Sequence, residues 1–270
     1  MNITQKSLLT AFVFLMAISS AQATTVVIRI APKEIVVAAD SKWRDISVGD
    51  YVADKIISIG PNGFMAAAGI LELQFNALSD FDVFRSARSC KSAGTKEAMQ
   101  SFANSCSKEI SEELSTELRA GRLNRPDWYE RLVYNKVILD IGFFGREEGQ
   151  LKAYMREIFH DPITDALRIK NFDFEGQRDV VAAWGYSNEI DSVLTHQRDY
   201  WNRTSTTTAA CTLVSLEIQK HPEAVGWPVK VLRLTHNGSK WITFEKSCDE
   251  TSPNPAPQPK RAPVKRKKRG

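Results

Sequence analysis

The sequence has few of the motifs that identify common enzyme classes. It contains no G-x-S-x-G, no H-E-x-x-H, no Walker loop and no Rossmann glycine pattern. Only four histidines occur in 270 residues, and none has the spacing of a metal-ligand pair. We interpret them as surface or loop residues: His160, His196, His221 and His236. The sequence therefore predicts neither a metal site nor a cofactor.

Long hydrophobic runs are also scarce, and the one that is present lies near the start, from Leu8 to Ile18. It follows a single base, Lys6, and precedes Ala21-Gln22-Ala23, a small-x-small cleavage signal. A membrane span needs about 20 residues, so a removable secretory signal fits this run better than an uncleaved anchor. We expect residues 1–23 to be cleaved and the mature protein to begin at Thr24. The protein would then be periplasmic or secreted.

Positive charge is concentrated outside the main body of the chain. Of the formal net charge of +4, residues 250–270 supply +6 and Lys6 supplies +1, which leaves −3 for residues 24–249. The body is therefore not a basic nucleic-acid-binding surface. The tail holds five prolines and seven Lys or Arg residues, a composition typical of disorder. It could bind a polyanion or an anionic surface, or it could simply increase solubility.

Cysteines number four, and no pair has the C-x-x-C spacing of a zinc site. An even number of cysteines in an exported chain favours disulfides, with three possible pairings. We prefer Cys90–Cys106 and Cys211–Cys248. The alternative is four buried thiols.

The order of predicted elements indicates an α+β fold with one globular body over residues 24–249. Apolar and β-branched runs predict strands at 24–30, 35–39, 51–59, 64–69, 137–144, 151–158, 179–184, 229–235 and 240–244. Helical spacing predicts helices at 71–81, at 98–118, from Ser187 or Asn188, and at 206–220. Residues 41–50 are polar, and residues 159–177 are interpreted as a loop insertion. Two groups of strands, each followed by two helices, predict two packed sheets with a helix layer on each side.

Three residues of the first half are candidates for chemistry. An N-terminal Thr24 would carry both a hydroxyl nucleophile and a free α-amine, which titrates near ~8 and can act as a base. The predicted hairpin brings Asp40 close to Thr24, although an aspartate at a strand end is also a common turn residue. Lys55 lies in apolar surroundings, where it would need an anionic partner such as Asp40. The alternative is a surface lysine with a buried stem.

These residues resemble the N-terminal half of proteasome β-type subunits, which are N-terminal-nucleophile (Ntn) hydrolases. The resemblance rests on Thr24-Thr25-Val26-Val27, on the stretch from Ile35 to Lys42, and on Asp54-Lys55-Ile56. Asp40 lies 16 positions after Thr24, as in the family, and Lys55 lies 31 positions after it, one short of the family spacing. Weaker similarity continues through Val180–Ser187 and Gly226-Trp227-Pro228-Val229, so that residues 24–245 are covered.

The resemblance implies a four-layer αββα sandwich and a threonine-type peptidase or amidase. Thr24 would be the nucleophile, Asp40 and Lys55 would support it, and Gly69 would provide the oxyanion hole. Peptide or other amide substrates are implied, and assembly into a homo-oligomer is compatible with the family.

Two supporting positions depart from the family pattern. The family's supporting serine falls on or beside Tyr186, with Ser187 next to it, and its supporting aspartate falls near Pro222, between His221 and Glu223. These departures leave two alternatives to the enzyme. One is an inactive binding or assembly module with the same fold, and the other is a scaffold for the basic tail.

Overall fold

The computed structural model describes residues 24–45, 49–73, 80–90, 98–134, 137–175, 179–197, 199–202 and 204–249. The predicted leader and the basic tail lie outside these ranges, so the expectations stated for them stay predictions.

The first of two five-stranded sheets is built around the predicted N-terminal hairpin of β1 (Thr25–Ala31) and β2 (Glu34–Asp40). β12 (Val180–Gly185) pairs with β1, and β13 (Val229–Thr235) pairs with β2. β14 (Gly238–Phe244) completes the order β12-β1-β2-β13-β14, in which every pair is antiparallel. Valine and isoleucine fill the centres of β1 and β2, where both faces are buried, because β-branched side chains pack well on a pleated surface.

The second sheet has the order β11-β10-β9-β6-β5, again with antiparallel pairs. Its strands are β5 (Ile56–Ser58), β6 (Gly63–Gly69), β9 (Val137–Glu147), β10 (Gln150–Asp161) and β11 (Ala166–Glu175). Two short ribbons lie outside the large sheets: β3 (Lys42–Asp45) with β4 (Gly49–Val52), and β7 (Glu72–Leu73) with β8 (Phe81–Asp82).

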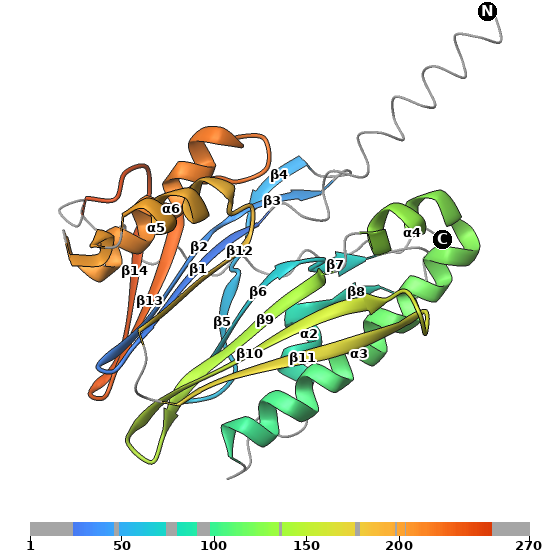
Figure 1. Ribbon diagram of the computed structural model, residues 1–270, viewed down its shortest axis with the longest axis horizontal. Helices are drawn as coiled ribbons and strands as arrows, with labels where there is room; N and C mark the ends of the chain where they lie inside the picture. The colour runs from blue at the N-terminus through green and yellow to red at the C-terminus, as the bar shows by residue number, and fades with distance from the viewer. Residues whose placement is uncertain are drawn as a thin grey trace, which may run out of the picture.

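Helices cover the outer face of each sheet, as Figure 1 shows. The second sheet is covered by α2 (Val83–Ser89), α3 (Met99–Asn124) and α4 (Pro126–Tyr134). The first is covered by α5 (Asn188–His196), the short 3-10 helix at Tyr200–Asn202 and α6 (Thr206–Lys220).

Three buried clusters hold these layers together. One cluster joins the inner faces of the two sheets and includes Val26, Ile28, Ala68 and Phe144. A second lies between the second sheet and α2, α3 and α4, and a third lies between the first sheet and α5 and α6. The inner cluster brings β6 of the second sheet against β1 and β12 of the first, which are distant from it in sequence.

The predicted helix at 71–81 is wrong at both of its ends, and residues 74–79 lie outside the described ranges. Leu71 and Phe81 are buried as the pattern required, but β7 and β8 occupy both ends of this segment, and the helix begins only at Val83. Asp82 determines that start, because its carboxylate accepts the N–H groups of Phe84 (2.9 Å) and Arg85 (3.1 Å) as an N-cap.

Strands also form in two segments that the sequence analysis interpreted as loops. β10 and β11 occupy most of residues 159–177, and β3 and β4 occupy part of residues 41–50. In β11 the apolar residues change from one face of the strand to the other: Leu167 and Ile169 pack toward the helices, whereas Phe172 and Phe174 pack toward the other sheet. The hydrophobic residues therefore do not follow one alternating pattern through the whole strand.

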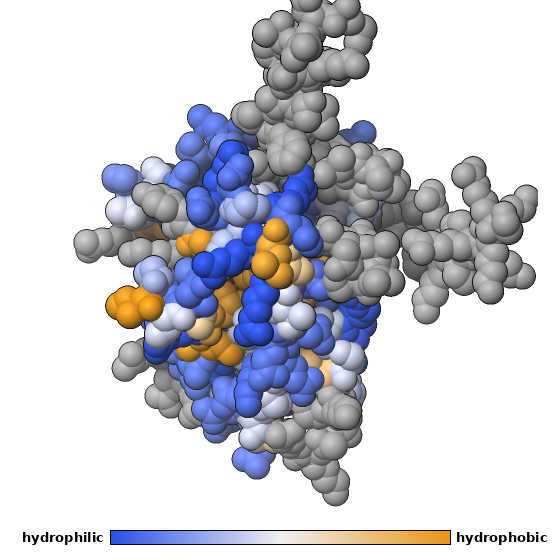
Figure 2. Space-filling model, turned by 90° about the vertical axis from the view of Figure 1, so that its right-hand side faces the viewer, coloured by the Kyte–Doolittle hydropathy of each residue, from blue (hydrophilic) through white to orange (hydrophobic). Residues whose placement is uncertain are grey.

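Both preferred disulfides are confirmed: Cys90 is bonded to Cys106 and Cys211 to Cys248. Two disulfides are consistent with an oxidising, exported location. Within the described ranges, no helix combines the length and the hydrophobicity needed to cross a bilayer. The face drawn in Figure 2 is mainly hydrophilic, with hydrophobic residues in small spots.

Candidate active site

The backbone at the start of β1 is held between two other segments. Thr25 pairs with Gly185 of β12, the Tyr186 N–H donates to the Thr24 carbonyl (2.9 Å), and the Thr25 hydroxyl donates to the Tyr186 carbonyl (2.9 Å). On the other side, the Thr25 N–H donates to Asp40 Oδ1 (2.8 Å). Thr24 is only 1% exposed. The residue predicted to be the nucleophile is therefore fixed in position from both sides.

Asp40 is the point at which three segments meet. Besides the Thr25 N–H, its carboxylate accepts the N–H groups of Lys42 (3.1 Å) and Gly226 (3.4 Å), both at Oδ2. The register explains this convergence, because Asp40 ends β2 and pairs with Val229, the first residue of β13. The Gly226 loop that leads into β13 is thereby brought against the end of the N-terminal hairpin. Asp40 is thus more than a turn residue.

Lys55 donates from Nζ to both oxygens of Asp40, at 2.9 and 2.8 Å. Neither side chain has any exposed surface. The alternative of a surface lysine is therefore wrong. Burial raises the pKa of the Asp40 carboxyl and lowers the pKa of the Lys55 ammonium, while the attraction between the two charges opposes both shifts.

Gly69, the predicted oxyanion-hole residue, ends β6 with a φ of +104°. A Cβ at this position would lie 2.4 Å from the Ile138 carbonyl oxygen, so both the conformation and the space require glycine. Its neighbour Ala68 contacts the segment that holds Thr24, since a Cβ on Gly185 would lie 3.7 Å from the Ala68 Cβ. Gly69 therefore follows a residue that packs against the turn beside Thr24, and its role as a donor stays a prediction.

Gly185 is a determinant of the site that the sequence analysis did not identify. Its φ is +76°, and a Cβ there would lie 1.8 Å from the Thr24 carbonyl oxygen. Any side chain at this position would displace Thr24. The signal in the sequence is the Gly-Tyr-Ser turn after a buried strand, but only the pairing of β12 with β1 reveals what the glycine contacts.

The two departing support positions lie beside the site and face each other. The ring centroids of Tyr186 and His221 are 4.7 Å apart, and burial, followed by the charge of Glu223, raises the pKa of the Tyr186 hydroxyl. Ser187 turns away, because its hydroxyl donates to Asp191 Oδ2 (3.2 Å). The Pro222 carbonyl accepts a hydrogen bond from Lys42 Nζ (2.7 Å). Tyr186 thus contributes its backbone to Thr24 and its ring to His221.

α5 begins at Asn188, one of the two predicted starts, but its N-terminus is capped from another helix. Ser187 occupies the N-cap position but makes no cap hydrogen bond. The fully buried Glu217 of α6 instead accepts the N–H groups of Glu189 (2.8 Å) and Ile190 (3.2 Å) at Oε1. This contact ties the two helices together behind Tyr186.

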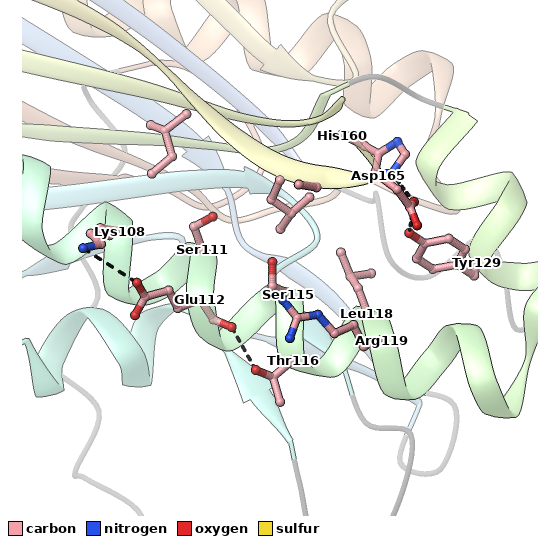
Figure 3. A pocket seen from close by; sticks show the side chains of 13 residues that line it. Lys108, Ser111, Glu112, Ser115, Thr116, Leu118, Arg119, Tyr129, His160 and Asp165 are labelled. Atoms are coloured by element: carbon pink, nitrogen blue, oxygen red, sulfur yellow. Dashed lines mark hydrogen bonds and ion pairs between the residues drawn. The ribbon is translucent and has the colours of Figure 1, made fainter. Parts of the chain in front are cut away.

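A separate groove of about 510 Å³ lies between α3, α4 and the β10–β11 hairpin, far from these residues in the fold. Figure 3 shows His160 and Tyr129 converging on Asp165, at 2.9 and 3.1 Å. The carboxylate of Asp165 is thereby already satisfied. None of the predicted site residues lines this groove.

Comparison with known proteins adds little to this geometry. No protein-family model and no curated protein match the sequence. Among solved structures, the chain is similar to a protein described as "Anbu (Gly-1) mutant from Hyphomicrobium sp. strain MC1", with a TM-score of 0.47 and 11% identity. The alignment covers 82% of this chain and 87% of that one. Such a distant likeness leaves the assignment of function to the residues themselves.

Proposed function

We propose that this protein is a threonine-type Ntn hydrolase that cleaves peptide or other amide bonds through an acyl-enzyme. The observation that carries the proposal is the buried Asp40–Lys55 pair, whose carboxylate also binds the backbone N–H of Thr25, directly after Thr24. A buried ion pair is costly and can often be replaced by apolar residues without loss of stability. Its contact with the backbone of the residue after Thr24, the predicted N-terminal residue, favours a catalytic role.

The layered arrangement supports assignment to the αββα sandwich of this class. The two five-stranded sheets, the three buried clusters and the helices on the outer faces are the features that support it.

In the proposed mechanism, Thr24 Oγ bonds to the carbonyl carbon of the substrate. The hydroxyl proton passes, through a water molecule, to the α-amine of Thr24. The positive charge of Lys55 favours the developing alkoxide, and the N–H of Gly69 stabilises the oxyanion, a contribution of typically ~3 kcal/mol. The C–N bond then breaks, the leaving amine takes the proton, and water hydrolyses the ester.

The leader would control this chemistry, because the α-amine exists only after cleavage following Ala23. Export would therefore both deliver the protein and create its base. A peptide bond to residue 23 would leave Thr24 with a hydroxyl but without a free amine.

The proposal is tested on the exported protein. N-terminal sequencing should find Thr24 as the first residue, and a threonine-directed covalent inhibitor should label that residue. Thr24→Ala should abolish labelling and hydrolysis while the far-UV circular dichroism spectrum is retained. Thr116→Ala is the matched control, since Thr116 is exposed on α3 and its hydroxyl bonds only within that helix, to the Glu112 carbonyl (3.0 Å).

A different mature terminus, or full activity in Thr24→Ala, would contradict the mechanism. A correctly processed chain that no inhibitor labels would instead favour the inactive binding or assembly module.

A further inference from the structure

A small cavity opens between the two sheets near Thr24. It has a volume of about 120 Å³ and is lined by residues of β9, β10, β11 and β12: Asp140, Met155, Arg156, Glu157, Phe172 and Trp184. Its volume equals that of about four water molecules, which suits one extended side chain. β11 and β12 are edge strands of their sheets, so the cavity lies at the side where the layer between the sheets ends.

Three contacts link the cavity to the candidate nucleophile. Asp140 pairs directly with Ala68 in the β9–β6 ladder. Ala68 lies against Gly185, which in turn lies against the Thr24 carbonyl. Trp184 directly precedes Gly185 and faces the inner cluster, and its ring contacts the position where Gly142 has no side chain. The tryptophan therefore connects the wall of the cavity to the strand that holds Thr24.

The Asp140 carboxyl has no hydrogen bond or ion pair with any residue in the described ranges, and its side chain is half-buried. The nearby guanidinium does not compensate for it. The Arg156 side chain lies on the face of β10 that is turned toward the helices. Its guanidinium donates to Asp173 Oδ1 (2.6 Å) and Asn104 Oδ1 (2.7 Å), next to α3. Glu157, which pairs with Asp140 across the strands, adds a second negative group. A half-buried carboxyl without a partner at the wall of a cavity is a group that a bound cation would pair with.

We propose that this cavity is a substrate subsite that takes a cationic side chain, such as that of lysine or arginine, with Asp140 as the residue that selects it. The aliphatic stem would lie against Met155 and the ring of Trp184, and the charged end would meet Asp140, with Glu157 as a second acceptor. Tryptophan is also the aromatic ring with the strongest attraction for cations. The inference rests on the proposed function, since it names the substrate class of that site.

Specificity is measured with peptide inhibitors that label Thr24 and differ at one position, carrying lysine, arginine, methionine or glutamate. Each position of the peptide is scanned, and the second-order labelling rate is compared. The processed wild-type protein should prefer lysine or arginine over methionine by about tenfold or more at one position, because a desolvated charge pair discriminates strongly. Asp140→Asn should reduce that ratio to about twofold. Asp140→Lys should reverse it in favour of glutamate.

Asp127→Asn is the matched control, because it makes the same chemical change at an exposed position on α4. It should leave both the rates and the ratio unchanged. Equal labelling by the lysine and methionine inhibitors at every position, or an unchanged ratio in Asp140→Asn, would overturn the proposal.

A second measurement separates this inference from the proposed function. n-Butylammonium should shift the indole N–H resonance that Trp184→Phe removes, whereas neutral 1-butanol should not. If no inhibitor labels Thr24 but the ammonium ion binds, the hydrolase is wrong and the cation site stands. If Thr24 is labelled without preference and the ammonium ion causes no shift, the hydrolase stands and the cation site is wrong.

Discussion

The buried Asp40–Lys55 pair leads to a clear prediction about stability, because removing one partner leaves the other as an unpaired buried charge. Asp40→Asn leaves the Lys55 ammonium without an anion and weakens the contacts to the Thr25, Lys42 and Gly226 N–H groups. We expect it to lower the free energy of unfolding by about 5 kcal/mol, the upper end of the range for a broken buried pair. Lys55→Met should cost less, about 3 kcal/mol, because the three N–H groups still stabilise the carboxylate.

The double variant Asp40→Asn/Lys55→Met is the informative one. It contains neither charge, so its loss should be smaller than the sum of the two single losses, with a coupling of about 2–3 kcal/mol. The assay is urea unfolding of the processed protein at pH 7 with both disulfides intact, followed by circular dichroism. The control is the same cycle on an exposed ion pair, with Asp80→Asn, Arg85→Met and the double variant. Asp80 and Arg85 are joined at 2.9 Å, and both side chains are more than half exposed. That exposed pair should couple by less than about 1 kcal/mol.

Additive losses in the double variant would refute the reasoning. They would mean that Asp40 and Lys55 do not interact in the folded protein, and the electrostatic support proposed for Thr24 would disappear with them.

Three further predictions concern glycine geometry, a disulfide and pH. Gly185→Ala should abolish labelling of Thr24 and destabilise the protein more than Gly149→Ala. Both glycines have positive φ (76° and 77°), but among the described residues only the Cβ added at Gly185 would have a neighbouring atom within 4 Å. Equal effects of the two variants in labelling and urea assays would contradict this. Replacing Cys211 and Cys248 by serine should lower the free energy of unfolding by about 4 kcal/mol in the chain-entropy account, since the disulfide closes a loop of 37 residues. Burial, followed by the charge of Glu157, raises the pKa of Asp140 to about 7, so the native state loses stability as the pH rises from about 4, the ordinary pKa of an aspartate, through 7. Asp140→Asn should therefore gain up to about 4 kcal/mol over wild type in urea at pH 8 and nothing at pH 3.5, and an equal gain at both pH values would contradict the assignment.

Elements with one clear periodicity could be predicted from the sequence. α6 spans Thr206–Lys220, the predicted range, and the apolar residues from Phe102 to Leu118 form the buried stripe of α3. The N-terminal hairpin also follows from its β-branched runs, and its register alone places Asp40 beside the start of β1. These features depend on contacts between residues close in sequence.

Elements that take their pairing from elsewhere could not be predicted. The short ribbon of β7 and β8 was mistaken for a helix, because Leu71 and Phe81 are buried in either structure. β11 was missed because it buries opposite faces at its two ends.

The sequence by itself determined the order of strands and helices in most of the chain and singled out Thr24, Asp40 and Lys55 as candidates, because spacing, composition and short-range register are properties of the chain. It left three cysteine pairings open. Only the tertiary structure decided that Asp40 and Lys55 are in contact, that Gly185 leaves room for Thr24, and that Asp140 faces a cavity beside Trp184. The Asp40–Lys55 contact and the cavity form only when the two sheets pack together, and the Gly185 contact forms only when β12 pairs with β1. A charged side chain is buried only in the packed state, and its burial is costly unless the charge is paired. Buried charges therefore indicate functional residues only once the structure is known.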